Sequence, residues 1–239
     1  MNSSEEADPE LASIGVRASA ERMPLDTERI VAAAIEFIDE FDLRDLTMRR
    51  LGSALGVEAM ALYRYVPSRD DLLDLVVASI IDEMNRDPEV LAAPQNGWQD
   101  FLQRLAHGVR KIALAHPMAF PLVASRPPEA PWLRPPLRSL TWVESFLRAM
   151  TSEGFTNKGA VAAYRAFTSF LLGHLLLEVA ARGAQIAPIH DEEVTRQGES
   201  LAKYPQIVQV QVELAEDHSL AEFEDSLENL LTRIAMLRG

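Results

Sequence analysis

Apolar residues recur every three or four positions along most of this chain, which is the spacing of one face of an α-helix. The first such stripe is formed by Ile30, Ala34, Phe37 and Phe41, and Asp26 before it is a residue type that caps helices. The pattern predicts helices over 27–41, 48–55, 59–65, 69–85, 98–116, 137–153, 157–182 and 219–237, with shorter ones after Pro117 and over 192–203. The segment VQVQV at 208–212 alternates as a strand would, but it has no partner. We therefore predict an all-α protein.

Two segments without a sustained period divide these helices into domains. Residues 1–23 are predicted to form a flexible N-terminal arm, and residues 87–97 hold two prolines, an asparagine and a glycine and are typical of a linker. The predicted domains are a small helical unit over 24–85 and a larger helical domain over 86–239.

The stretch 46–71 has the pattern of two short helices joined by a tight turn. Thr47 can cap the first helix, and Gly56 can take the left-handed conformation that ends it. Gly52 lies where the two helices must approach closely, and the second helix must end before Pro67. Ser68 and Asp71 are spaced as a capping box for the next helix. This pattern predicts a helix-turn-helix, whose second helix enters the major groove of DNA.

Charge supports this interpretation once its distribution is considered. The net charge of −13 argues against nucleic acid as a partner. From 46 to 69, however, four arginines face one glutamate, Glu58, and 4 − 1 gives a local charge of +3. The acidic residues gather in 36–45 and 213–228 instead. Tyr63 and Tyr65 lie two positions apart and cannot both face inward, and we expect one of them to be buried.

The composition indicates the cellular compartment in which the protein is expected to work. The chain has no cysteine, so disulfides and cysteine metal sites are excluded. The N-terminus is acidic and lacks the apolar segment of a signal peptide, and we expect no membrane span. These features are typical of a cytoplasmic protein.

Residues 25–85 resemble the DNA-binding domain of the tetracycline-repressor (TetR) family, on the segments LTMRRLGSALGVEAMALYRYV and SRDDLLD. GWQDFL, Arg126-Pro127, EGF at 153–155 and LLGHLLLE at 171–178 resemble the C-terminal domain of the tetracycline repressors themselves. The resemblance covers 25–182 and, more loosely, the last helix. It implies an all-helical homodimer that binds palindromic double-stranded DNA and is released by a small-molecule effector.

The resemblance also implies a set of DNA-binding residues. Thr47, Tyr63 and Arg69 match phosphate-contacting positions, and Arg49 matches an arginine that reaches bases and phosphates. The exposed face of the recognition helix carries two alanines where the tetracycline repressors have polar readers, and Arg64 is our candidate for a bidentate guanine contact. The complete predicted set is Thr47, Arg49, Arg50, Ala59, Met60, Ala61, Tyr63, Arg64, Tyr65 and Arg69.

At the positions that bind the effector, this chain differs from the tetracycline repressors. The positions that hold their polar drug contacts are here Asn85, Leu105, Leu122 and Phe146, of which three are apolar. Stranding polar groups of a ligand against hydrocarbon costs free energy, so we predict an apolar or aromatic effector other than tetracycline. The predicted ligand-binding residues are Asn85, Leu105, Val109, Leu122, Arg126, Trp142, Phe146, Phe170 and His174.

Small residues at helical spacing on the most apolar helix are typical either of ordinary core or of close contact between protomers. The resemblance favours a four-helix dimer interface formed with the last helix. The predicted interface residues are Ala160, Ala163, Ala166, Gly173, Leu177, Phe223, Leu227, Leu230 and Leu231.

Other functions have weaker support in the sequence. The protein could activate transcription, or bind DNA without an effector. The motif DDLLD, with Asp70, Asp71 and Asp74, matches a magnesium motif of helical terpenoid synthases, but no second metal motif follows it. His174 and Glu178 are four apart and could hold a metal together with His107 or His116, although an ordinary pocket or interface histidine is more common. We therefore predict no cofactor, no metal site and no enzymatic activity.

Overall fold

The structure is a computed structural model that describes residues 24–86, 94–126, 130, 132–133, 139–184 and 203–238. Within these residues it contains helices and no strands, as predicted. The helices are α1 (Thr27–Phe41), α2 (Met48–Leu55), α3 (Ala59–Leu62), α4 (Arg69–Arg86), α6 (Trp98–Ala115), α7 (Pro121–Ser125), α8 (Leu140–Ser152), α9 (Asn157–Ala181), α10 (Pro205–Gln209), α11 (Gln211–Ala215) and α12 (Ser219–Ala235). The predicted arm over 1–23 lies outside the described residues, as do 87–93 of the linker and 192–202 of the predicted short helix.

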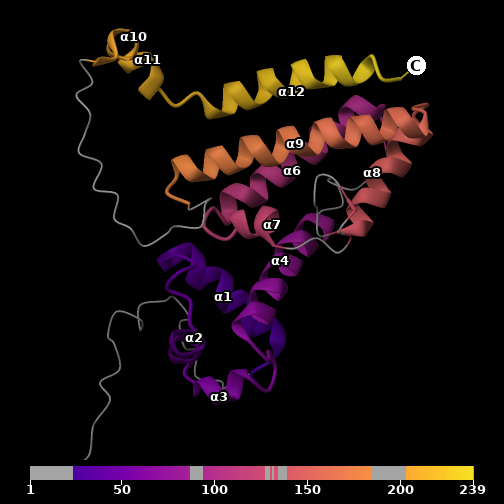
Figure 1. Ribbon diagram of the computed structural model, residues 1–239. Coiled ribbons are helices and arrows are strands. Elements are labelled where there is room, and N and C mark those ends of the chain that lie inside the picture. Colours follow the sequence, from indigo (N-terminus) through magenta and orange to yellow (C-terminus); the bar gives the residue numbers. More distant parts are fainter. Residues whose placement is uncertain are drawn as a thin grey trace, which may run out of the picture.

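Helices α1, α2 and α3 and the first part of α4 form a small unit, which we call the head (Figure 1). Its core contains Ile30, Phe37, Leu51 and Leu62, whose side chains have no exposed surface. Local caps define its helices: the side chain of Asp26 accepts a hydrogen bond from the backbone N–H of Arg29, as predicted.

The remaining helices form a larger body, into which α4 leads from the head (Figure 1). Helix α9 packs against α6, α8 and α12, and α4 packs against α6 and α7. Helices α9 and α12 lie side by side and run in opposite directions (Figure 1), so that the first turn of α9 meets the end of α12. By length and composition α9 is apolar enough to cross a membrane, but it packs here against α6, α8 and α12.

A buried ion pair joins three helices of the body. Arg110 of α6 donates from Nε and Nη2 to the carboxylate oxygens of Glu178 in α9, at 3.0 and 2.6 Å. The Glu178 side chain is only 3% exposed, and the Arg110 guanidinium also lies 5.4 Å from the ring centre of Phe223 in α12. The pair therefore satisfies a carboxylate that would otherwise be costly to bury.

Some elements differ from the prediction. Helix α3 ends at Leu62 rather than near 65, and residues 63–65 form a turn in which the backbone N–H groups of Tyr65 and Val66 donate to the carbonyl of Leu62. The VQVQV segment belongs to α10 and α11, so its alternation does not mark a strand. The sequence also suggests Ser219 as the cap of the last helix, but Ser219 begins α12 without a side-chain cap, and its N–H donates to Asp217.

Candidate nucleic-acid interface and ligand pocket

The turn between α2 and α3 has the close approach and the backbone geometry that the sequence predicts. The hydroxyl of Thr47 accepts from the N–H of Arg50 and caps α2, and Gly56 ends this helix with φ of 70°. A Cβ atom on Gly52 would lie 2.8 Å from the carbonyl oxygen of Val57. Because that oxygen belongs to the backbone, a larger residue at position 52 would displace the turn that positions α3.

Helix α3 and the turn after it present a row of side chains to solvent. Met60 is 73% exposed, Tyr63 and Tyr65 are each 43% exposed, and Arg64 is exposed as well. The expectation that a tyrosine would be buried is wrong, because Leu62 and Val66 fill the inward positions. Ala59 and Ala61 are half-buried beside this row.

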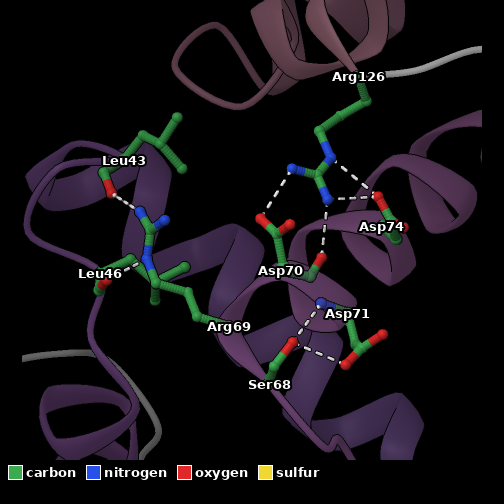
Figure 2. Close-up of polar contacts among 8 residues, drawn as sticks. All are labelled: Leu43, Leu46, Ser68, Arg69, Asp70, Asp71, Asp74 and Arg126. Atoms are coloured by element: carbon green, nitrogen blue, oxygen red, sulfur yellow. Dashed lines mark hydrogen bonds and ion pairs between the residues drawn. The ribbon is translucent and has the colours of Figure 1, made fainter.

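Two arginines of the predicted DNA-binding set make contacts inside the head. Arg69 donates from Nε to the carbonyl of Leu46 and from Nη2 to that of Leu43, both at 2.8 Å, and so fastens α4 to the loop before α2 (Figure 2). Arg50 pairs with Asp45 and lies over the rings of Phe37 and Phe41. Both guanidiniums are thus engaged within the head, although the Arg50 side chain keeps 31% of its surface exposed, and their contact with DNA stays a prediction.

Arg49 and Arg64 are therefore the exposed cations among the four that gave the local charge of +3. All four arginines were predicted alike to bind DNA. The partners of Arg69 lie 23 and 26 residues away and cannot be recognised from local spacing.

A cavity lies in the body between α4, α6, α8 and α9. Its walls are apolar apart from two hydroxyl side chains, and its free volume is about 20 Å³, roughly that needed for one water molecule. It is lined by Ile81, Met84, Val109, Phe120, Val123, Ser139, Trp142, Thr168, Leu171 and Leu172.

Only Val109 and Trp142 of the predicted ligand-binding residues line this cavity. Three others are fully buried in the core near it: Leu105, Leu122 and Phe146. Phe170 and His174 pack on Phe223 of α12 and so belong to a different face of α9. The helical spacing of Leu72, Val76, Ile80 and Met84 in α4 indicates that Met84 faces inward, but no local signal indicates which buried residues border free space.

Three buried polar side-chain atoms have no hydrogen-bond partner among the described residues: Nε1 of Trp142 and Oγ1 of Thr168, whose residues line the cavity, and Oδ1 of Asn85. Trp142 is only 4% exposed, and its indole Nε1 is buried and unpaired. The side-chain oxygen of Asn85, a predicted ligand contact, is also buried without a partner. Buried polar groups are nearly always paired in folded proteins, so each of these atoms marks a place where a polar partner would be stabilised.

Arg126 lies outside the cavity, which corrects its predicted role there. Its guanidinium donates from Nε and Nη2 to Asp74 at 2.8 and 2.6 Å, and from Nη1 to the carboxylate of Asp70 at 3.0 Å (Figure 2). Burial alone would lower the pKa of Arg126, but the hydrogen bonds to Asp74 and Asp70 raise it above its ordinary value. The end of α7 is thereby tied to the first turns of α4.

These contacts also account for the aspartates of the DDLLD motif. Asp70 and Asp74 bind Arg126, while Asp71 forms the predicted capping box with Ser68, whose hydroxyl lies 2.7 Å from its carboxylate (Figure 2). Among the described residues there is no group of three or more His, Asp or Glu side chains that could hold a metal. Glu178 is likewise paired with Arg110 rather than with His174.

A second polar cluster joins the head to the body. Asp39 of α1 lies 2.9 Å from His116 Nδ1, and it accepts hydrogen bonds from the N–H groups of Met118 and Ala119 at 3.1 and 3.2 Å. His116 Nε2 lies 3.3 Å from Glu83 of α4. The hydrogen bond to Asp39 raises the pKa of His116, against the smaller opposing effect of burial, and the charges of Asp39 and Glu83 act in the same direction. This cluster was not predicted, because the sequence suggested His116 only as the end of a helix or as a possible metal ligand.

The predicted dimer-interface residues divide into two groups. One group is buried inside the single chain and forms the α9–α12 core, which corrects its assignment: Ala160, Ala163, Phe223, Leu227 and Leu231. The other group keeps exposed surface: Ala166, Gly173, Leu177 and Leu230. Leu177 is 67% exposed, and a Cβ added to Gly173 would have no neighbour within 4 Å.

Comparison with known proteins agrees with this architecture. The family described as bacterial regulatory proteins, tetR family, matches residues 30–76, and the tetracyclin repressor-like C-terminal domain matches residues 91–237. The chain belongs to the TetR family. Its relatives are transcriptional regulators built from a helix-turn-helix domain and a helical C-terminal domain.

Individual relatives have low sequence identity to this chain. An HTH-type transcriptional regulator of Saccharopolyspora erythraea is 30% identical over 154 residues, which are 64% of this chain and 61% of the relative. The class D tetracycline repressor protein of Escherichia coli is 31% identical over 153 residues, or 64% of this chain and 66% of the relative. These alignments thus span less than two thirds of either relative.

Among solved structures, a possible TetR family transcriptional regulator from Streptomyces coelicolor A3(2) superposes with a TM-score of 0.69 at 28% identity. That match covers 88% of this chain and 99% of the other. The agreement therefore extends over both the head and the body.

Proposed function

We propose that this TetR family protein is a transcriptional repressor that binds a palindromic operator as a homodimer and releases it when a small effector binds the body. The observation that carries the proposal is the exposed row on and after α3, where Met60, Tyr63, Arg64 and Tyr65 project from a rigid helix-turn-helix. Such a helix fits the major groove, and Arg64 is available for a bidentate contact with guanine.

Repression rather than activation is supported by relatives such as the class D tetracycline repressor protein, whose name states that role. A gel-shift with the DNA upstream of the coding sequence tests the proposal, and we expect a sequence-specific band that weakens as salt rises. If the protein binds DNA without sequence preference, the repressor assignment is wrong. We also expect the protein to act in the cytoplasm, where its operator would lie.

The effector would act through helix α4. Ile81 and Met84 of α4 form one wall of the cavity, whose volume of about 20 Å³ is far below the several hundred that an effector-sized ligand fills. A ligand that enters must therefore push its walls apart, and α4 connects that wall to the head. Effector binding would thus shift the population toward a different head position, with lower affinity for the operator.

The lining favours a neutral, largely apolar effector that carries one hydrogen-bond acceptor. Among the described residues no charged side chain lines the cavity, so a charged ligand would lose its hydration without gaining an ion pair from them. The unpaired Nε1 of Trp142 would donate to an acceptor such as a carbonyl oxygen.

Fluorenone and fluorene differ by one carbonyl and make a matched pair of probes. We expect fluorenone to raise the melting temperature of the protein more than fluorene does, because a ligand that prefers the native state stabilises it. The difference should disappear in Trp142→Phe. If Trp142→Phe keeps the preference for fluorenone, the indole is not the donor.

A further inference from the structure

The most distinctive contact between the head and the body is the cluster of Asp39, His116 and Glu83, which we call the joint. Both carboxylate oxygens of Asp39 are engaged, Oδ2 with the His116 ring and Oδ1 with the backbone N–H groups of Met118 and Ala119. Asp39 belongs to α1 of the head, whereas residues 116–119 form the turn between α6 and α7 of the body. The contact joins residues 77 to 80 positions apart, so it constrains tertiary structure rather than a local turn.

His116 reaches two helices at once, α1 of the head and the last turns of α4. Its Nδ1 faces Asp39 of α1, and its Nε2 faces Glu83 of α4 at 3.3 Å. A neutral imidazole carries a single N–H and can donate to only one of these carboxylates, whereas the imidazolium donates to both. The joint is therefore complete only when His116 is protonated.

A second attachment stabilises the same helix at its other end. Arg126 binds Asp70 and Asp74 in the first turns of α4 (Figure 2). Glu83 lies in the last turns of the same helix. Glu83 lies nine positions after Asp74, which corresponds to about 14 Å along the helix. Two attachments at that separation fix the direction of α4, whereas one alone would leave the head able to rotate about it.

We propose that Asp39 and His116 are positioning residues that set the angle of the head on the body and thereby determine which spacing between two DNA half-sites the dimer accepts. This inference rests on the proposed function, because half-site spacing has meaning only for a dimer that binds a palindrome. Neither residue needs to touch DNA, since both act through the orientation of α3. The intrinsic affinity of one head for one half-site is therefore independent of the joint.

The test uses the full-length protein and a palindrome that the wild type selects from a random duplex library. Duplexes are then made with the same half-sites moved apart or together by one or two base pairs, along with a duplex that holds a single half-site. The variants are Asp39→Asn and His116→Gln. Glu36→Gln and Glu40→Gln are matched controls, because both glutamates lie on α1, are exposed and carry the same charge as Asp39.

We expect the wild type and both controls to prefer the selected spacing strongly. Asp39→Asn and His116→Gln should lose about fivefold or more of that preference, while their affinity for the single half-site stays at the wild-type value. Binding to the single half-site also shows whether each variant is folded. If Asp39→Asn does not fold, the test is made with His116→Gln alone. An unchanged spacing profile in a variant that binds the single half-site overturns the inference.

A pH series distinguishes positioning from mere structural support. Since the folded protein holds His116 at a raised pKa, the joint is complete below about pH 6.5, the ordinary histidine value, and is lost as the pH rises through the higher folded pKa. The spacing preference of the wild type should fall over that range, and that of His116→Gln should be flat. The inference is wrong if His116→Gln keeps the wild-type pH profile.

The outcomes also separate the inference from the proposed function. If the wild type selects no DNA at all, the proposed function fails and the spacing claim fails with it. If it selects a palindrome but Asp39→Asn and His116→Gln keep its spacing profile, only the joint is refuted. NMR titration of His116 adds a readout that needs no DNA: its pKa should fall in Asp39→Asn and stay unchanged in Glu36→Gln.

Discussion

At the scale of single residues, the arginines of this protein divide by where their hydrogen bonds go. Arg50 and Arg69 bind groups of the head, Arg110 a carboxylate in the body, and Arg126 the start of α4. Arg64, by contrast, lies exposed beside the exposed tyrosines of the α3 region. Its guanidinium is the one that we expect to determine sequence preference.

Replacing Arg64 tests that role. Arg64→Ala should weaken binding by about 1–3 kcal/mol and relax the preference at one base pair of each half-site, because a bidentate contact to guanine would be lost. Affinities for all single-base variants of the half-site measure this effect. Arg44→Ala removes an exposed arginine before α2 and should leave base preference unchanged. Weakening spread equally over all sequences would mean that Arg64 contacts only phosphate.

The buried pair of Arg110 and Glu178 gives a prediction about stability. Glu178→Gln should lower the free energy of unfolding by about 3 kcal/mol, because it leaves the half-buried Arg110 without its counter-charge. Urea unfolding at a fixed protein concentration measures the change. Glu222→Gln, an exposed position on α12, should stay within about 0.5 kcal/mol of the wild type. Equal stability of the two variants would show that the pair contributes nothing.

The residue scale also shows what the sequence can predict. Thr47 and the Ser68–Asp71 capping box were predictable because their partners lie three residues away, within one helical turn. The contacts of Arg126 and His116 were not predictable, because their partners depend on how the helices pack: Asp74 lies 52 residues from Arg126, and Asp39 lies 77 residues from His116. Long-range ion pairs that could not be predicted were thus the main cause of error in the predicted site.

At the scale of elements, the turn between α2 and α3 depends on Gly52. Gly52→Ala would place a Cβ 2.8 Å from a backbone oxygen, and no side-chain rotation can relieve that contact. We expect a loss of roughly 1–3 kcal/mol in stability, as for other overpacked positions, together with weaker DNA binding. Thermal unfolding and operator titration measure both, with Ser53→Ala on the exposed side of α2 as control. If Gly52→Ala binds and melts like the wild type, the close approach does not matter.

Helix ends were predicted well wherever a local cap or glycine exists, as at Asp26 and Gly56. Helix α3 was predicted too long, because the sequence marks only the limit set by Pro67 and not the turn that begins at Tyr63. The small residues of α9 could not be assigned from sequence either. Ala160 and Ala163 pack inside the protomer, whereas Gly173 faces outward.

At the scale of the whole molecule, the outward face of α9 is where we expect two protomers to meet. Leu177→Glu should shift the protein toward monomers, because it would bury charge in an apolar contact. Sedimentation at several concentrations measures the dimer dissociation constant. Leu140→Glu changes an exposed leucine on α8 in the same way and should leave that constant unchanged. A Leu177→Glu dimer as tight as the wild type would place the interface elsewhere.

The most direct test of the account is a titration of full-length protein against the operator palindrome at several salt concentrations, followed by fluorescence anisotropy. We predict binding of two protomers per palindrome, much tighter than binding to a scrambled duplex, with log affinity falling linearly with log salt. Equal affinity for the palindrome and the scrambled duplex would contradict the claim that the α3 region reads DNA sequence.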